Sequence, residues 1–108
     1  MALRPPRNLR LESGASILDY ELVGEKAATL GRLGERATAA LARLHAGDPA
    51  DRRVLVDDAA EAVWHYFIQR ELCGFRDNKD MIAHYGIPGE VLVRLGAIER
   101  DPEPAPQR

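Results

Sequence analysis

Apolar and polar residues recur along the chain with helical spacing, and this pattern predicts four helices. The four are expected over residues 17–45, residues 49–73, a two-turn segment capped by Asp77 that ends at Tyr85 and Gly86, and a segment from Pro88 to Gly96. No segment shows the alternation that is typical of a strand. The pattern therefore predicts an all-α fold, in which a long antiparallel helical hairpin is capped by two short C-terminal helices.

Residues with clear helix-end preferences support these boundaries. Ser16 is a suitable N-cap for the first helix, and Asp19 stands at the capping-box position. Asp48 and Pro49 are suited to open the second helix as its N-cap and first residue. Prolines recur near both ends of the chain. The expected organisation is an irregular N-terminal arm over residues 1–15, a single helical domain over residues 16–97 and a Pro-rich disordered tail over residues 98–108.

The first helix carries two faces that could each be covered. An apolar stripe is expected to pack into the core and consists of Val23, Leu30, Leu33, Ala37, Leu41 and Leu44. Small residues line a nearly opposite face, called here the outer face, and are Gly24, Ala28, Gly31, Thr38 and Ala42. Glycines inside a helix cost about 0.5–1 kcal/mol each relative to alanine, so a close contact is expected to compensate.

A second copy of the chain could provide that contact. One chain has too few helices to cover both faces of a rod about 43 Å long. The outer face therefore predicts a homodimer, with these five small residues at or near the contact. The alternative is that Gly24, Gly31 and Gly34 accommodate the chain's own short helices. The remaining arc is a charged ridge expected to face solvent, made of Glu21, Glu25, Arg32, Arg36 and Arg43.

The second helix is apolar around most of its circumference, which is typical of a central element. Its one polar line is Asp58, Glu61, His65 and Gln69. Carboxylates and an imidazole on one face could hold a divalent metal, but Glu61 and His65 are four residues apart and no second helix carries a matching set. A solvated face is the favoured interpretation, and we expect neither a metal nor another cofactor.

Arg70 falls on the apolar stripe of the second helix, where a charge needs a partner. Glu71, Asp77 and Asp80 are the nearest acidic residues in the sequence. The favoured prediction is a structural ion pair or capping network of Arg70 with these acids. The alternative is an arginine presented to an anionic ligand. Cys73 lies at the end of the same helix, where the helix dipole raises a thiol pKa, so it is a poor candidate nucleophile.

Residues 75–96 have the spacing of a helix-turn-helix unit. Ile82, Gly86, Ile87, Leu92 and Leu95 occupy the corresponding positions. The second of the two helices is short and mostly apolar, and its only polar side chains are Glu90 and Arg94. The segment is therefore expected to fold back on the hairpin as an apolar cap, with DNA reading as the alternative.

Composition narrows the class of protein. The chain has 108 residues, which suits one domain, and 15 basic against 17 acidic residues give a net charge of −2. This balance makes a nucleic-acid partner unlikely. The single cysteine excludes an intramolecular disulfide and suits a reducing compartment. No apolar run is long enough for a membrane helix, so we expect no membrane association and a cytoplasmic location.

Two segments carry a resemblance to a known family. They are "LDYELVGEKAATLGRLG" and "VWHYFIQRELCGFRDNKDMIAHYGIPGEVLVRLG". Together they resemble a family of short, all-helical bacterial proteins that is classified only as a domain of unknown function. The resemblance covers roughly residues 18–96. It implies a compact helical protein and brings no activity, cofactor or site residue with it.

The sequence thus favours a non-enzymatic helical interaction or assembly module that forms a homodimer. Its protein partner, if it has one besides itself, is unknown. The first alternative is a small helix-turn-helix-like DNA-associated regulator that uses residues 75–96. The second is a helical bundle that binds a metal or small ligand around Glu61, His65 and Arg70.

Overall fold

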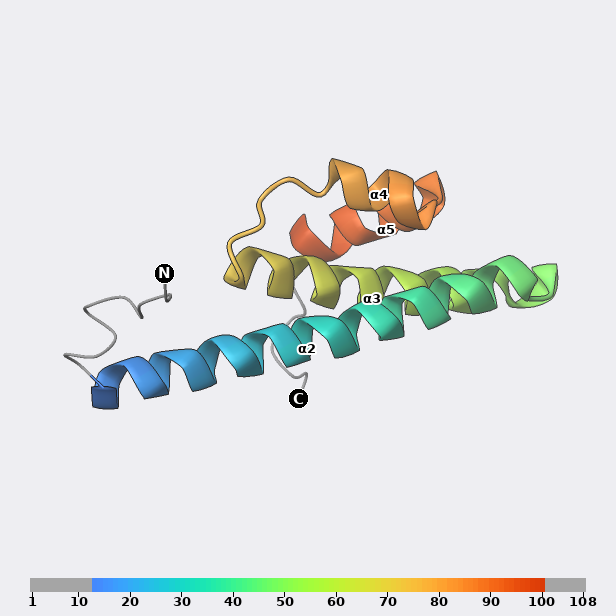
Figure 1. Ribbon diagram of the computed structural model, residues 1–108. Coiled ribbons are helices and arrows are strands. Elements are labelled where there is room, and N and C mark those ends of the chain that lie inside the picture. Colours follow the sequence, from blue (N-terminus) through green and yellow to red (C-terminus); the bar gives the residue numbers. More distant parts are fainter. Residues whose placement is uncertain (1–12, 101–108) are drawn as a thin grey trace, which may run out of the picture.

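The computed structural model describes the backbone of residues 13–100 and the side chains of residues 17–100. Its elements are α2 (Ser13–Ala46), the 3-10 turn η1 (Pro49–Asp51), α3 (Arg52–Leu72), α4 (Lys79–Tyr85) and α5 (Gly89–Arg100) (Figure 1). The described part of the chain contains helices and no strand, so the all-α prediction is confirmed. Residues 1–12 and 101–108, which make up most of the expected arm and tail, lie outside the described residues.

Several expected helix ends differ from those observed; at α4, for example, the N-cap is Asn78 and not Asp77. Residues 13–16 are already helical, so Ser16 is not the N-cap and Asp19 lies beyond the first turn of α2. At the other end of the domain, α5 continues through Gly96 to Arg100. Ile98 is half-buried against the core, and this packing offsets the cost of a glycine inside the helix, which is about 1 kcal/mol.

The turn between α2 and α3 follows the expected capping chemistry. Asp48 is the N-cap of η1, and its Oδ1 accepts a hydrogen bond of 2.9 Å from the backbone N–H of Ala50. Pro49 occupies the first position, where its missing N–H costs nothing. A Cβ atom at Gly47 would lie 2.9 Å from the carbonyl oxygen of Arg43, so only glycine fits here without a shift of the chain.

Glycines with positive φ end both α3 and α4. Gly74 has a φ of 98° and Gly86 a φ of 60°, a region in which side chains other than glycine are strained. In each case the next residue turns back to the helix: the N–H of Phe75 donates to the Arg70 carbonyl at 2.8 Å, and that of Ile87 to the Ile82 carbonyl at 3.0 Å. These are Schellman-type ends, which allow the chain to reverse within a few residues.

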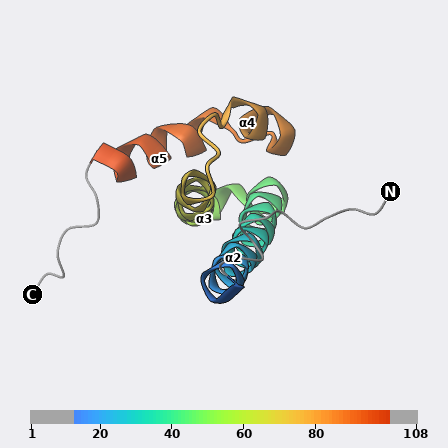
Figure 2. The same ribbon diagram turned by 60° about the vertical axis from the view of Figure 1, so that its left-hand side comes forward.

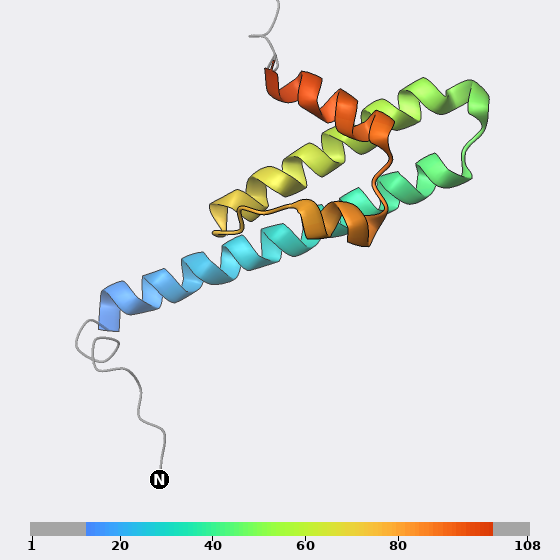
Figure 3. The same ribbon diagram turned by 90° about the horizontal axis from the view of Figure 1, so that it is seen from above.

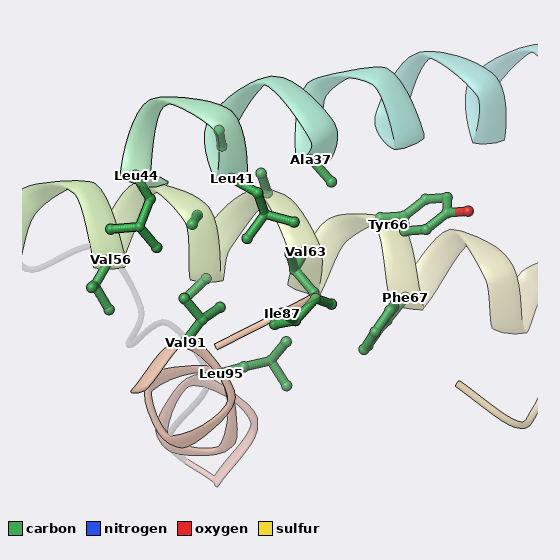
Figure 4. Close-up of a cluster of buried hydrophobic side chains, with 14 residues drawn as sticks. Ala37, Leu41, Leu44, Val56, Val63, Tyr66, Phe67, Ile87, Val91 and Leu95 are labelled. Atoms are coloured by element: carbon green, nitrogen blue, oxygen red, sulfur yellow. The ribbon is translucent and has the colours of Figure 1, made fainter. Parts of the chain in front are cut away.

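The core lies on both sides of α3. Figure 2 shows α3 between α2 on one side and α5 on the other. Small residues of α3 are completely buried there, among them Ala59, Ala60 and Val63, and allow close packing. From α2 the core receives Ala37, Leu41 and Leu44, and from α5 it receives Val91 and Leu95 (Figure 4).

The predicted core stripe of α2 is therefore only partly buried. Its C-terminal half lies in the core, and Leu30 and Leu33 pack against it half-buried. Val23, however, is 62% exposed. The reason is geometric: the C-terminal end of α3 lies beside Lys26, whose carbonyl oxygen is 3.4 Å from Gln69 Nε2 and 3.9 Å from Cys73 Sγ. No part of α3 reaches Val23.

Candidate functional site

Arg70 is buried, but its partners differ from the expected carboxylates. Its Nε donates to Asn78 Oδ1 at 2.7 Å, and its Nη2 donates to the backbone carbonyl of Asp77 at 3.1 Å. The guanidinium also lies 4.9 Å from the centre of the Phe75 ring. Glu71 and Asp80 are exposed, and the Asp77 carboxylate instead accepts a hydrogen bond from the N–H of Lys79.

The expected ion pair of Arg70 is therefore replaced by hydrogen bonds to neutral oxygens. These bonds join the end of α3 to the segment that leads into α4. Arg70 as a residue is 9% exposed, and its Nε and Nη2 both donate within the chain, so this geometry favours the structural interpretation over presentation to a ligand.

The polar line of α3 lies along the helix without gathering three possible metal ligands in the part of the chain that the structure describes. Of its members, His65 is half-buried and its Nδ1 lies 3.2 Å from the Arg36 guanidinium of α2. Nowhere between residues 13 and 100 do three His, Cys, Asp or Glu side chains come together as metal ligands would. Cys73 is half-buried. Its Sγ lies 3.9 Å from the carbonyl oxygen of Lys26.

The helix-turn-helix-like segment uses its second helix to pack on α3. Val91 and Leu95 of α5 are buried in the core. The two polar residues that could face DNA are engaged with α3: Glu90 pairs with Arg52, and Arg94 Nε lies 2.9 Å from Asp57 Oδ1. This arrangement resembles the apolar cap expected from the sequence and leaves α5 few free polar side chains.

Five of the ten large apolar side chains that are exposed in the described part of the chain lie at the N-terminal end of α2. Figure 3 shows this end extending past the end of α3, so that no other described element lies beside it. We call residues 17–25 the projecting segment. Its five large apolar side chains are between 53% and 66% exposed and are Ile17, Leu18, Tyr20, Leu22 and Val23. Sequence periodicity places these residues on a helix but does not reveal that α3 ends before reaching them.

Farther along α2, the outer face forms the floor of a hollow of about 580 Å³. Gly31, Thr38 and Ala42 line the floor, and Tyr66 of α3 and Tyr85 of α4 form a wall. The two tyrosine rings meet edge to face, with centroids 5.9 Å apart. The neighbouring Tyr66 hydroxyl and, to a lesser extent, partial burial raise the pKa of the Tyr85 phenol.

The glycines of α2 differ in what an added side chain would meet, and for none of Gly24, Gly31 and Gly34 is that neighbour one of the short helices expected in the alternative interpretation. A Cβ atom at Gly34 would lie 3.2 Å from the Tyr66 ring, so this glycine accommodates the chain's own α3. At Gly24 and Gly31 a Cβ atom would meet nothing within 4 Å. The five residues predicted for the dimer contact are exposed on the single chain: Gly24, Ala28, Gly31, Thr38 and Ala42.

Sequence comparison provides the family. A family model matches residues 3–103 to DUF6665, a family of unknown function. The chain belongs to the DUF6665 family. The match is wider than the expected resemblance over residues 18–96, since it includes the α2–α3 turn and parts of both ends. No curated protein and no solved structure matches the chain.

The fold of this DUF6665 member includes no candidate membrane helix in its described part: none of the helices between residues 13 and 100 is both long and apolar enough to cross a bilayer. Among the described residues of α2, the large apolar side chains that are exposed lie at its N-terminal end. Together, the projecting segment and the hollow form the candidate site, which is exposed and mostly apolar.

Proposed function

We propose that this DUF6665 protein is a non-enzymatic helical assembly module and that it forms a homodimer through α2. The observation that carries the proposal is the projecting segment, where five large apolar side chains stand exposed within seven residues. Contiguous apolar surface of this kind on a small protein marks an interaction site. These large apolar side chains lie among the acidic residues of the segment, and no other described element covers them.

The nature of the surface favours a protein partner over a small ligand. The hollow is open, its floor is a helix face of mostly small residues, and the one charged residue in its lining, Glu35, is exposed. Pockets that hold small ligands instead enclose most of the ligand surface and place several polar groups around it. A helix is the element that best fits a straight floor of this kind, since small residues allow two helix backbones to approach closely.

Size-exclusion chromatography with light scattering tests the proposal. The wild-type chain should have twice its monomer mass of 12.0 kDa at micromolar concentration. The double variant Ile17→Glu/Tyr20→Glu places two charges in the projecting segment and should be a monomer. The matched control, Val54→Glu/Val93→Glu, changes two apolar residues that are equally exposed but lie on α3 and α5, and should remain a dimer.

Circular dichroism should show the same helical content in all three proteins, because every changed side chain is exposed. A wild-type chain that stays monomeric at high micromolar concentration would refute the homodimer. A projecting-segment variant that dimerises as tightly as the control would place the contact elsewhere and refute the assignment to α2.

A further inference from the structure

The charged ridge of α2 has an order that bears on how two copies would meet. Its first four residues are Glu21 and Glu25 followed by Arg32 and Arg36, and all four side chains are exposed; Arg43, its last residue, lies two turns farther on. At 100° per residue the four lie within an arc of about 60°. One side of the helix is therefore acidic in its N-terminal half and basic in its C-terminal half.

This order is unfavourable within a single chain. Glu21 and Glu25 are four residues apart, as are Arg32 and Arg36, and like charges at that spacing repel each other. Among the residues that the structure describes, the ion pairs are Arg52 with Glu90 and Arg94 with Asp57, and neither involves α2. Arg32 contacts only the Thr29 hydroxyl at 3.0 Å, and Arg36 contacts His65.

An antiparallel second copy would pair all four charges. If a two-fold axis passes beside Ala28 and Thr29, Glu21 lies opposite Arg36 of the other copy, and Glu25 lies opposite Arg32. When two antiparallel helices are related by a two-fold axis normal to the plane that contains them, the same surface of each helix faces the same way along that axis. The charged ridges of the two copies therefore lie next to each other. In a parallel pair, the two ridges would lie on opposite sides and could not meet.

The same register brings the projecting segment to the hollow. Ile17 and Tyr20 of one copy come beside Thr38 and Ala42 of the other, so large side chains lie against small ones. In this register residues 17–25 come opposite residues 32–40 of the other copy, which lie within the stretch of α2 from Ala27 to Ala42 that lines the hollow. Each copy supplies one projecting segment and one hollow, so the contact closes as a dimer.

We propose that the α2 helices of two copies pack antiparallel about a two-fold axis beside Ala28 and Thr29. Each projecting segment fills the hollow of the other copy, and the charged ridges form two symmetric sets of Glu21–Arg36 and Glu25–Arg32 pairs. This inference rests on the homodimer proposed above and identifies its contact, its orientation and its register.

Charge reversal tests the register. The variants Glu21→Arg/Glu25→Arg and Arg32→Glu/Arg36→Glu each place like charges across the contact, and each should raise the dimer Kd at least tenfold. The quadruple variant that combines all four changes restores opposite charges in the antiparallel register and should dimerise like the wild type. Mixed with the wild type, it should form few heterodimers by native mass spectrometry, because the mixed pair brings like charges together.

The control is Arg53→Glu/Glu71→Arg, two exposed residues of α3 that form no described ion pair. It should dimerise with the same Kd as the wild type, and its subunits should form mixed dimers freely with wild-type subunits. A wild-type dimer whose charge variants behave like this control would overturn the register while the homodimer stands. A quadruple variant that stays monomeric, or that mixes statistically with the wild type, would overturn the register as well.

Disulfide formation gives a second measurement that does not depend on charge. In a Cys73→Ala background, chains with Tyr20→Cys and chains with Thr38→Cys are mixed and oxidised. The antiparallel register predicts a cross-linked heterodimer between the two kinds of chain and little cross-linking of either kind alone. If the Tyr20→Cys chains instead cross-link mainly with each other, and not with the Thr38→Cys chains, the helices are parallel and the proposal is overturned.

Discussion

At the scale of single residues, Arg70 shows how a buried charge is held without an ion pair. A buried ion costs several kcal/mol unless its donors are satisfied. Arg70 satisfies them with the Asn78 side chain and the Asp77 carbonyl, both in the segment that connects α3 to α4. The Phe75 ring covers one face of the guanidinium. The sequence predicted a structural network for Arg70, but not its partners, because the turn at Gly74 decides which groups come within reach.

Replacing Arg70 should therefore destabilise the fold. Arg70→Ala removes two hydrogen bonds made by a charged group, and we expect a loss of about 2–3 kcal/mol in the free energy of unfolding. Arg70→Lys keeps the charge but not the planar guanidinium group, so its loss in the free energy of unfolding should be intermediate. Urea denaturation followed by circular dichroism measures both. Arg76→Ala, at an exposed arginine in the same segment, is the control. An unchanged midpoint for Arg70→Ala would contradict the structural role.

At the scale of elements, the length of α3 decides which residues of α2 form the candidate site. Apolar periodicity runs through the whole of α2 and predicted one continuous core stripe, including Val23. Periodicity is a local property of one helix and does not record where a neighbouring helix ends. Gly74 ends α3 beside Lys26, so the stripe is buried from Leu30 onward and exposed before it. The first helix is predicted to have 29 residues and the second helix 25. This difference in length is the one sequence signal of the projecting segment.

Hydrogen exchange should detect the cover that the projecting segment gains in a dimer. We expect its amides, residues 17–25, to exchange quickly at low protein concentration and more slowly as the concentration rises through the dimer Kd. Amides of residues 89–100 in α5 lie outside the proposed contact and should exchange at a rate that depends much less on concentration. Mass spectrometry of peptic peptides measures both regions. Equal protection of residues 17–25 at all concentrations would contradict an intermolecular contact there.

The ion pair between the first turns of α3 and α5 predicts a specific pH dependence. The hydrogen bond from Arg52, with its positive charge, lowers the pKa of the Glu90 carboxyl. The pair therefore contributes stability at a pH above the unfolded pKa of Glu90, and this contribution disappears as the pH falls through the lower folded pKa. Arg52→Ala should return the Glu90 pKa toward its ordinary value, and Arg53→Ala should not. A carboxyl titration by NMR distinguishes the two outcomes.

At the scale of the whole molecule, the four helices complete one core and leave one surface uncovered. α3 is covered by α2 and α5, and the polar residues of α5 are paired with α3 (Figure 2). The all-α class and the apolar capping role of residues 75–96 could be read from the sequence because each depends on local periodicity and turn residues. The position of the hollow could not, because it requires Tyr66 and Tyr85 to meet across residues distant in the sequence.

The antiparallel dimer also predicts how the dimer Kd depends on salt concentration. Its Glu–Arg pairs lie on the exposed ridge, where ions screen them, and the Debye length falls from about 10 Å at 0.1 M salt to about 3 Å at 1 M. The dimer Kd should therefore rise with salt as the attraction is lost, while the apolar contact of the projecting segment persists. The uncharged variant Arg32→Gln/Arg36→Gln should bind more weakly at low salt and show little further weakening. Sedimentation equilibrium over a salt series measures both slopes, and equal slopes for the two proteins would show that the ridge does not contribute to the contact.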